Sequence, residues 1–165
     1  MRQVARDAAL LCDGVGEREL AVVTLAALAH DVVYDGKPGD DERRSAEWAR
    51  DQLTAAGVAE GDVARVEELV LATMAHEAPA EDLLAAVLLD ADLAVLGSDP
   101  IGYERYRVAV RLEYSHVPED VWKVGRTAVL RSLVGRPSLY LTEQARRQWS
   151  GKARRNLAAE LASLV

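Results

Sequence analysis

The sequence has few of the residues that cross-link or interrupt a chain, with one cysteine and five prolines among 165 residues. Because Cys12 is the only cysteine, an internal disulfide is excluded and a reducing compartment is favoured. We expect this cysteine to be a small buried side chain. No apolar run reaches the roughly 18 residues of a membrane span, and charges interrupt the N-terminal stretch too often for a signal peptide. We therefore expect a cytoplasmic protein.

Positive charge is also scarce. Lys and Arg number 20 against 27 Asp and Glu, which gives a formal net charge of -7. This excess of acidic residues argues against a broad electrostatic interface with nucleic acid or with an anionic membrane. Half of the residues are hydrophobic, and the chain has neither a low-complexity tract nor a repeat of fixed period. We expect one globular domain over residues 1–165.

No segment shows the sustained period-two alternation of a strand, whereas apolar residues recur at helical spacing nearly everywhere. The pattern predicts an all-α protein. The predicted helices cover residues 1–13, 17–31, 42–56, 61–76, 80–96, 100–115, 118–135 and 142–164.

Two aspartates interrupt the predicted helix 83–96, which is otherwise apolar on every side and therefore typical of a buried helix. Asp92 has bulky aliphatic neighbours one turn away in both directions, so an unpaired carboxylate there would be costly unless a cation relieves it. Asp90 points about 200° away around the helix, and we expect it to cap or pair nearby. The alternative for each aspartate is a salt bridge to a buried arginine such as Arg111 or Arg126.

A second polar group, His30 with Asp31, follows an apolar predicted helix in the stretch "LAHDVVYDG". The small residues Ala26 and Ala27 leave room for another helix or an ion to approach. Neutral imidazole with carboxylates is a usual ligand set for divalent metals, while the alternative is a hydrogen-bonded core histidine. His76 also ends an apolar predicted helix, and it is either a third imidazole of the same pocket or a helix C-terminal cap.

Six segments in order, from about residue 5 to the end, carry a family resemblance: "HDVVYD", "ERRSAEWA", "LLDADLAVLG", "VRLEYSHVP", "VGRTAVLRSLVGRPSLY" and "ARRNLAAEL". Together they resemble a bacterial branch of the HD-domain superfamily of metal-dependent phosphohydrolases. The resemblance implies an HD-domain-like helical bundle whose metal ligands come from separate helices in the order His, His-Asp, Asp. On this chain the doublet falls on His30 and Asp31 and the final aspartate on Asp92, while His76 matches an additional imidazole near the metal.

Members of the family carry a first histidine on the helix before the doublet. This sequence departs from that pattern, because no histidine precedes His30. We interpret residues 1–13 as the latter half of that helix, so that the chain begins after the missing ligand. A misplaced start codon, a truncation or a genuine loss would each explain this.

The resemblance implies hydrolysis of a phosphate ester in a small phosphorylated molecule or a nucleotide, with a divalent ion (Mg, Mn, Fe, Zn, Co or Ni) activating a water. Asp31 would orient that water as well as bind metal. Glu42 is a candidate general base, with helix capping as the alternative. Lys37, Arg111 and Arg126 are candidates for binding the phosphate oxygens. For the two arginines, structural pairing with Glu113, Asp90 or a helix end is the alternative.

We also consider functions other than hydrolysis. Without its first histidine, the chain would be a catalytically impaired HD-fold module that binds a nucleotide or a partner protein. A homodimer built on apolar faces is a further prediction. For the hydrolase we also place His76 among the candidate substrate-binding residues.

Overall fold

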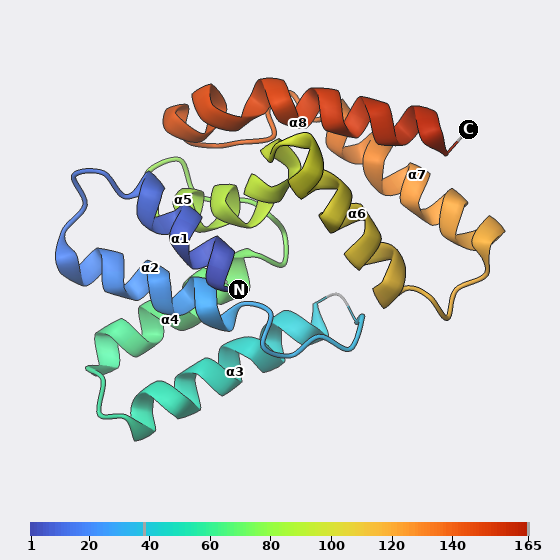
Figure 1. Ribbon diagram of the computed structural model, residues 1–165. Helices are drawn as coiled ribbons and strands as arrows, with labels where there is room; N and C mark the ends of the chain where they lie inside the picture. The colour runs from blue at the N-terminus through green and yellow to red at the C-terminus, as the bar shows by residue number, and fades with distance from the viewer. Residues whose placement is uncertain (38, 165) are drawn as a thin grey trace. The chain divides into compact units, whose positions relative to one another are not determined.

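The protein is all-α, as predicted, in the computed structural model shown in Figure 1, which describes residues 1–37 and 39–164. These residues form eight α-helices and one short 3-10 helix, and none of them lies in a strand. The elements are α1 (Arg2–Leu11), α2 (Glu17–Ala29), α3 (Asp40–Ala55), α4 (Glu60–Ala72), α5 (Leu83–Asp92), η1 (Leu93–Gly97), α6 (Pro100–Glu113), α7 (Glu119–Gly135) and α8 (Glu143–Ser163). Within the described residues, no helix combines the length and the apolar character that crossing a membrane requires.

The helices group into two compact units, Met1–Asp92 and Leu93–Val165. We describe each unit by itself. The prediction of one domain over residues 1–165 stays a prediction.

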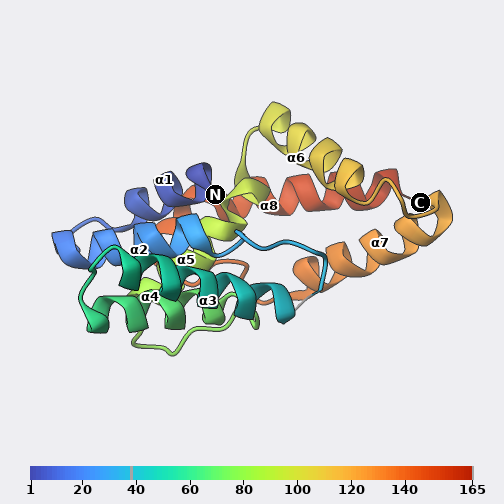
Figure 2. The ribbon, with the colours of Figure 1, turned by 90° about the horizontal axis from the view of Figure 1, so that it is seen from below.

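The N-terminal unit is built from α1 to α5. Helix α3 lies beside α4, and α1 lies beside α2, as Figures 1 and 2 both show. Helix α5 is buried along most of its length, which explains why its sequence is apolar on every side. Ala26 and Ala27 of α2 are fully buried, so their small side chains let neighbouring helices approach closely. Cys12 is buried in this core, as predicted.

Helix α4 ends earlier than predicted, at Ala72 instead of residue 76. The Thr73 hydroxyl donates to the Val70 carbonyl at 2.7 Å, and the Thr73 amide donates to the same carbonyl at 3.2 Å. These bonds to the residue three positions back tighten the last turn and end the helix. His76 therefore lies in a turn beyond α4, and its interpretation as a helix C-terminal cap is wrong.

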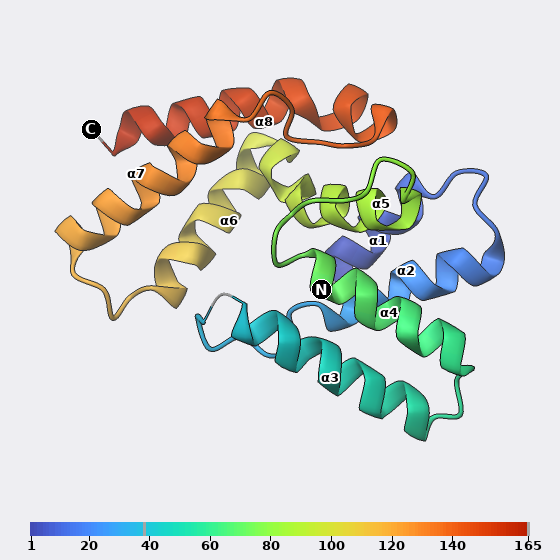
Figure 3. The ribbon, with the colours of Figure 1, turned by 180° about the vertical axis from the view of Figure 1, so that it is seen from behind.

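The C-terminal unit contains η1 and α6 to α8, and in Figure 3 both α6 and α7 extend away from α8. Asp99 and Thr142 cap the first turns of α6 and α8, accepting from the amides of Gly102 and Ala145. The Asn156 side chain of α8 donates to the carbonyls of Leu96 at 2.9 Å and Ser98 at 3.0 Å. This amide therefore joins α8 to the backbone around η1, a role that sequence reasoning did not assign.

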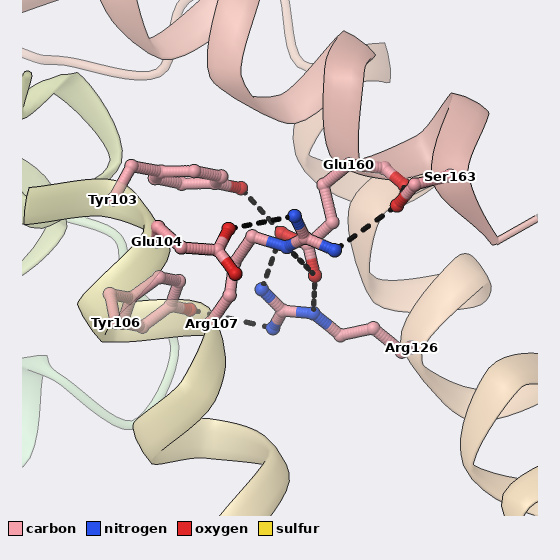
Figure 4. A network of polar contacts seen from close by, with 7 residues as sticks. All are labelled: Tyr103, Glu104, Tyr106, Arg107, Arg126, Glu160 and Ser163. Carbon is pink, nitrogen blue, oxygen red and sulfur yellow. Dashed lines mark hydrogen bonds and ion pairs between the residues drawn. The ribbon is translucent and has the colours of Figure 1, made fainter. Parts of the chain in front are cut away.

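A buried ion pair lies at the centre of the polar network in Figure 4. Arg126 donates to both carboxylate oxygens of Glu160, from Nε at 2.7 Å and from Nη2 at 3.0 Å. The Tyr103 hydroxyl donates to Glu160 Oε2 at 2.6 Å. Both charged side chains are about nine-tenths buried or more, so the carboxylate is held by a cation and a hydroxyl and not by water.

Gly97 permits the close contact between η1 and α8. A Cβ atom at this position would overlap the Trp149 side chain and come 2.9 Å from Trp149 Cα. We predict that Gly97→Ala lowers the free energy of unfolding by about 2 kcal/mol through overpacking. Gly125→Ala is the matched control, because Gly125 is inside α7 with open space around it, and alanine there should stabilise by up to about 1 kcal/mol. Urea denaturation of both variants checks this, and equal effects would contradict it.

The Glu160 network predicts a loss of stability in acid. Burial raises the pKa of Glu160, but Arg126 and Tyr103 lower it further, so the folded-state pKa lies below its ordinary value. The stabilisation is therefore complete above about pH 4.3, the ordinary glutamate pKa, and is lost as the pH falls towards the folded-state value. We expect Glu160→Gln to cost about 3 kcal/mol at pH 7, because Arg126 would stay buried without its counter-ion, and to weaken this pH dependence.

Denaturation at pH 7 and pH 3 measures both effects. The control is Glu143→Gln, also in α8, because Glu143 pairs with Arg147 at the exposed surface and should change stability by no more than about 0.5 kcal/mol. A cost at Glu160 as small as at Glu143 would contradict the assigned role.

Candidate metal centre

The structure brings His30, Asp31 and Asp92 together where two helices end. His30 is the C-terminal cap of α2, with Asp31 directly after it, and Asp92 is the last residue of α5. Helices α2 and α5 pack against each other, which places their C-terminal ends within reach of one another. The three side chains each offer a ligand atom, and these atoms all lie within 4.8 Å of one another.

The His30 ring is oriented by the backbone. It is 2% exposed, and its Nδ1 donates to the Ala27 carbonyl at 3.0 Å. A carbonyl only accepts, so this bond places a proton on Nδ1 and leaves the lone pair of neutral imidazole on Nε2. Metal-binding histidines commonly use their second nitrogen in this way.

The Nε2 atom of His30 faces two carboxylates without forming a hydrogen bond. It lies 3.3 Å from Asp31 Oδ2 and 3.3 Å from Asp92 Oδ1, and the atom is buried. Charge-assisted hydrogen bonds are shorter, about 2.7–2.9 Å. A buried nitrogen that converges on two carboxylate oxygens and lacks a partner fits a divalent cation, and so do the donor types.

The electrostatics of the cluster favour positive charge. Burial lowers the pKa of His30, but Asp31 and Asp92 outweigh it and raise this pKa to about 10. Burial raises the pKa of Asp92, but His30 and His76 lower it further, so Asp92 titrates well below its ordinary value. Without a metal, the proton on His30 Nε2 supplies the positive charge between the two carboxylates, and a divalent cation that binds there would replace that proton.

His76 joins the cluster through Asp92. Its Nε2 lies 3.0 Å from Asp92 Oδ2, the oxygen that does not face His30. His76 adopts a left-handed backbone conformation with φ of 50°, which is uncommon for a residue other than glycine. Such strain persists where the surrounding structure requires it, often at functional sites. The turn after α4 thus presents a second imidazole beside the three clustered groups.

Other predicted site residues have different partners. Glu42 accepts from the Gly39 amide at the N-cap of α3, which is the one bond of a capping box that a glycine N-cap allows. Arg126 is bound by Glu160, and Arg111 donates to Glu119 and to the Tyr114 carbonyl near the end of α6. The alternative for Asp92, a salt bridge to one of these arginines, is therefore wrong, because Asp92 faces the two histidines instead. Lys37 is exposed in the loop before α3.

Sequence reasoning missed two buried polar residues of α3, Asp41 and Ser45. Both bond to the backbone of the loop that follows Asp31. Their spacing of four residues, continued by the buried Ala49, was the available signal that they share the inner face of the helix.

No family model, curated protein or solved structure matches this chain. The resemblance to HD-domain phosphohydrolases therefore rests on the sequence segments alone.

Proposed function

We propose that this chain is a metal-dependent phosphohydrolase of HD-domain type, with one divalent cation held by His30, Asp31 and Asp92. The observation that carries the proposal is the buried Nε2 of His30, which lacks a hydrogen bond and lies 3.3 Å from an oxygen of each carboxylate. A divalent cation balances the two carboxylates in charge, and imidazole with carboxylate suits Mn, Fe, Co, Ni or Zn, while Mg favours the oxygens.

The surrounding residues support the same site. The Ala27 carbonyl fixes the His30 ring, and His76 contacts the second oxygen of Asp92, so two of the three ligands are oriented by partners of their own. Such supporting contacts commonly change metal affinity by 10- to 100-fold. His76 thereby gives the cluster a second imidazole, although the family's first histidine has no counterpart in the sequence.

A bound divalent cation would supply Lewis-acid stabilisation of negative charge on a phosphoryl oxygen. Asp31 is the ligand that solvent reaches most easily, since its side chain is 52% exposed and that of His30 is 2% exposed. Its carboxylate can accept a proton from an attacking water, as general base. His76 contacts Asp92 through Nε2, and with 27% of its side chain exposed it stays a candidate for contacting the substrate.

The substrate class follows from charge and from the resemblance. A phosphate ester, as a small phosphorylated molecule or a nucleotide, provides the oxyanion that a divalent cation binds, and the net charge of -7 argues against a nucleic acid polymer. Lys37 stays a candidate for contacting the phosphate. The proposal gives no part to Arg111, Arg126 or Glu42, because each has a structural partner. A homodimer and a cytoplasmic location stay predictions.

Metal content is the first test. After removal of bound ions and reloading with Mn²⁺, elemental analysis should find about one ion per chain, the number that one such ligand set holds. His30→Ala and Asp92→Asn should each weaken Mn²⁺ binding at least about tenfold, measured by calorimetry, because each removes a direct ligand. His116→Ala is the control, since this exposed histidine lies outside the cluster. A wild-type chain that binds no ion would overturn the proposal.

Catalysis is tested separately, with a chromogenic phosphate monoester and Mn²⁺. We expect metal-dependent turnover by the wild-type chain and a loss of about 100-fold in Asp31→Asn, which removes the proposed base. His116→Ala should keep the wild-type rate. If Mn²⁺ binds but neither phosphate monoesters nor nucleotides are hydrolysed, the chain is the non-catalytic module considered as the alternative.

A further inference from the structure

The loop that follows the His30–Asp31 doublet is fixed by side chains of α3. Asp41 Oδ2 accepts from the amides of Lys37 at 2.8 Å and Asp35 at 3.1 Å. Four residues along the same helix, Ser45 Oγ accepts from the Val33 amide at 3.1 Å and donates to the Val33 carbonyl at 3.3 Å. Thus three of the backbone amides over residues 33–37 are bound by two side chains.

Both anchoring side chains are buried. Asp41 is 6% exposed, and Ser45 is fully buried. The contact is reciprocal, because the Lys37 carbonyl accepts from the amides of Asp40 and Asp41, each at 3.0 Å. A carboxylate that accepts from backbone amides forms charge-assisted bonds, which are stronger than bonds between neutral groups. The loop is therefore held to the first two turns of α3 from both sides.

Asp31 depends on this anchoring more than His30 or Asp92 does. His30 and Asp92 each belong to a helix end, whereas Asp31 lies outside regular structure, two residues before the Ser45 contact at Val33. Its side chain is half exposed, so packing does little to define the carboxylate. The Val32 amide donates to the Ala29 carbonyl at 3.1 Å and closes the turn around Asp31, so the position of Asp31 Oδ2 relative to His30 Nε2 depends on this turn and on the path of the loop backbone that follows it.

We propose that Asp41 and Ser45 are positioning residues for the ligand Asp31, an inference that rests on the proposed metal site. They fix the loop so that the Asp31 carboxylate stays 3.3 Å from His30 Nε2 before an ion enters. A preorganised ligand loses less freedom on binding and so raises affinity. In this role Asp41 touches neither the cation nor the substrate. It affects the site only through the loop backbone that it holds in place.

At position 41, an oxygen that accepts hydrogen bonds matters more for holding the loop than the negative charge of the carboxylate does. Asp41 Oδ1 is buried and forms no hydrogen bond within the described residues, so only Oδ2 holds the loop. Asparagine at position 41 keeps one oxygen that can accept from both amides, whereas alanine removes it. The inference therefore predicts that Asp41→Asn retains most of the anchoring and that Asp41→Ala loses it.

The experiment compares Asp41→Ala, Asp41→Asn and Ser45→Ala in the full chain, by Mn²⁺ calorimetry and by hydrogen exchange of the Val33, Asp35 and Lys37 amides. We expect Asp41→Ala to weaken Mn²⁺ binding about tenfold and to speed exchange at Asp35 and Lys37. Ser45→Ala should speed exchange at Val33 and weaken binding too. Asp41→Asn should stay within about threefold of wild-type affinity, because a neutral acceptor forms the weaker bond.

Glu42→Ala is the matched control for a merely structural effect. It removes the capping bond to Gly39 at the start of the same helix but leaves the bonds to residues 33–37 in place. It should lower the urea midpoint without changing Mn²⁺ affinity. Faster exchange in Asp41→Ala with unchanged affinity would overturn the positioning role, and unchanged exchange would overturn the anchoring itself. A wild-type chain that binds no Mn²⁺ would overturn the metal site and this inference together, while the exchange rates would still show whether α3 holds the loop.

Discussion

The structure of the N-terminal unit depends on one electrostatic constraint at the ends of α2 and α5. Two carboxylates and an imidazole offer ligand atoms within 4.8 Å of one another, and the imidazole nitrogen among them is buried. Carboxylates this close repel each other unless positive charge lies between them, although water still reaches the half-exposed Asp31. The helices around the cluster therefore hold these three groups together despite the electrostatic cost.

The surrounding helices and turns fix the positions of the three groups. The fully buried Ala26 and Ala27 let α2 pack closely, and the apolar sides of α5 hold Asp92 at a defined depth. The turn after α4 contributes His76 at the cost of an unusual backbone conformation. Side chains at helix ends are held more rigidly than side chains in loops, so Asp31, the member of the cluster that follows its helix, is the group whose position needs further support.

Sequence patterns predicted the helices and the polar groups that meet at this centre, because both follow from short-range spacing. Asp92 stood out as a carboxylate in an apolar helix, and the doublet stood out at the end of another. The roles of Arg126 and Asp41 could not be predicted. Arg126 pairs with Glu160, 34 residues away, and helical periodicity shows that a side chain faces inward without identifying its partner. Asp41 bonds to amides of an irregular loop, which has no period to recognise.

A comparison of the Glu160 network with the histidine cluster shows why the cluster is the functional candidate. Glu160 has two bonds from Arg126 and one from Tyr103, all between 2.6 and 3.0 Å, so its charge is matched within the protein. His30 Nε2 has two carboxylate oxygens at 3.3 Å and no hydrogen bond. The charges of a structural ion pair in a protein interior are normally matched, because an unmatched buried charge costs several kcal/mol. The histidine cluster is therefore the better candidate for binding a ligand, and its donor types are those that divalent cations use, which is why we propose a metal site there.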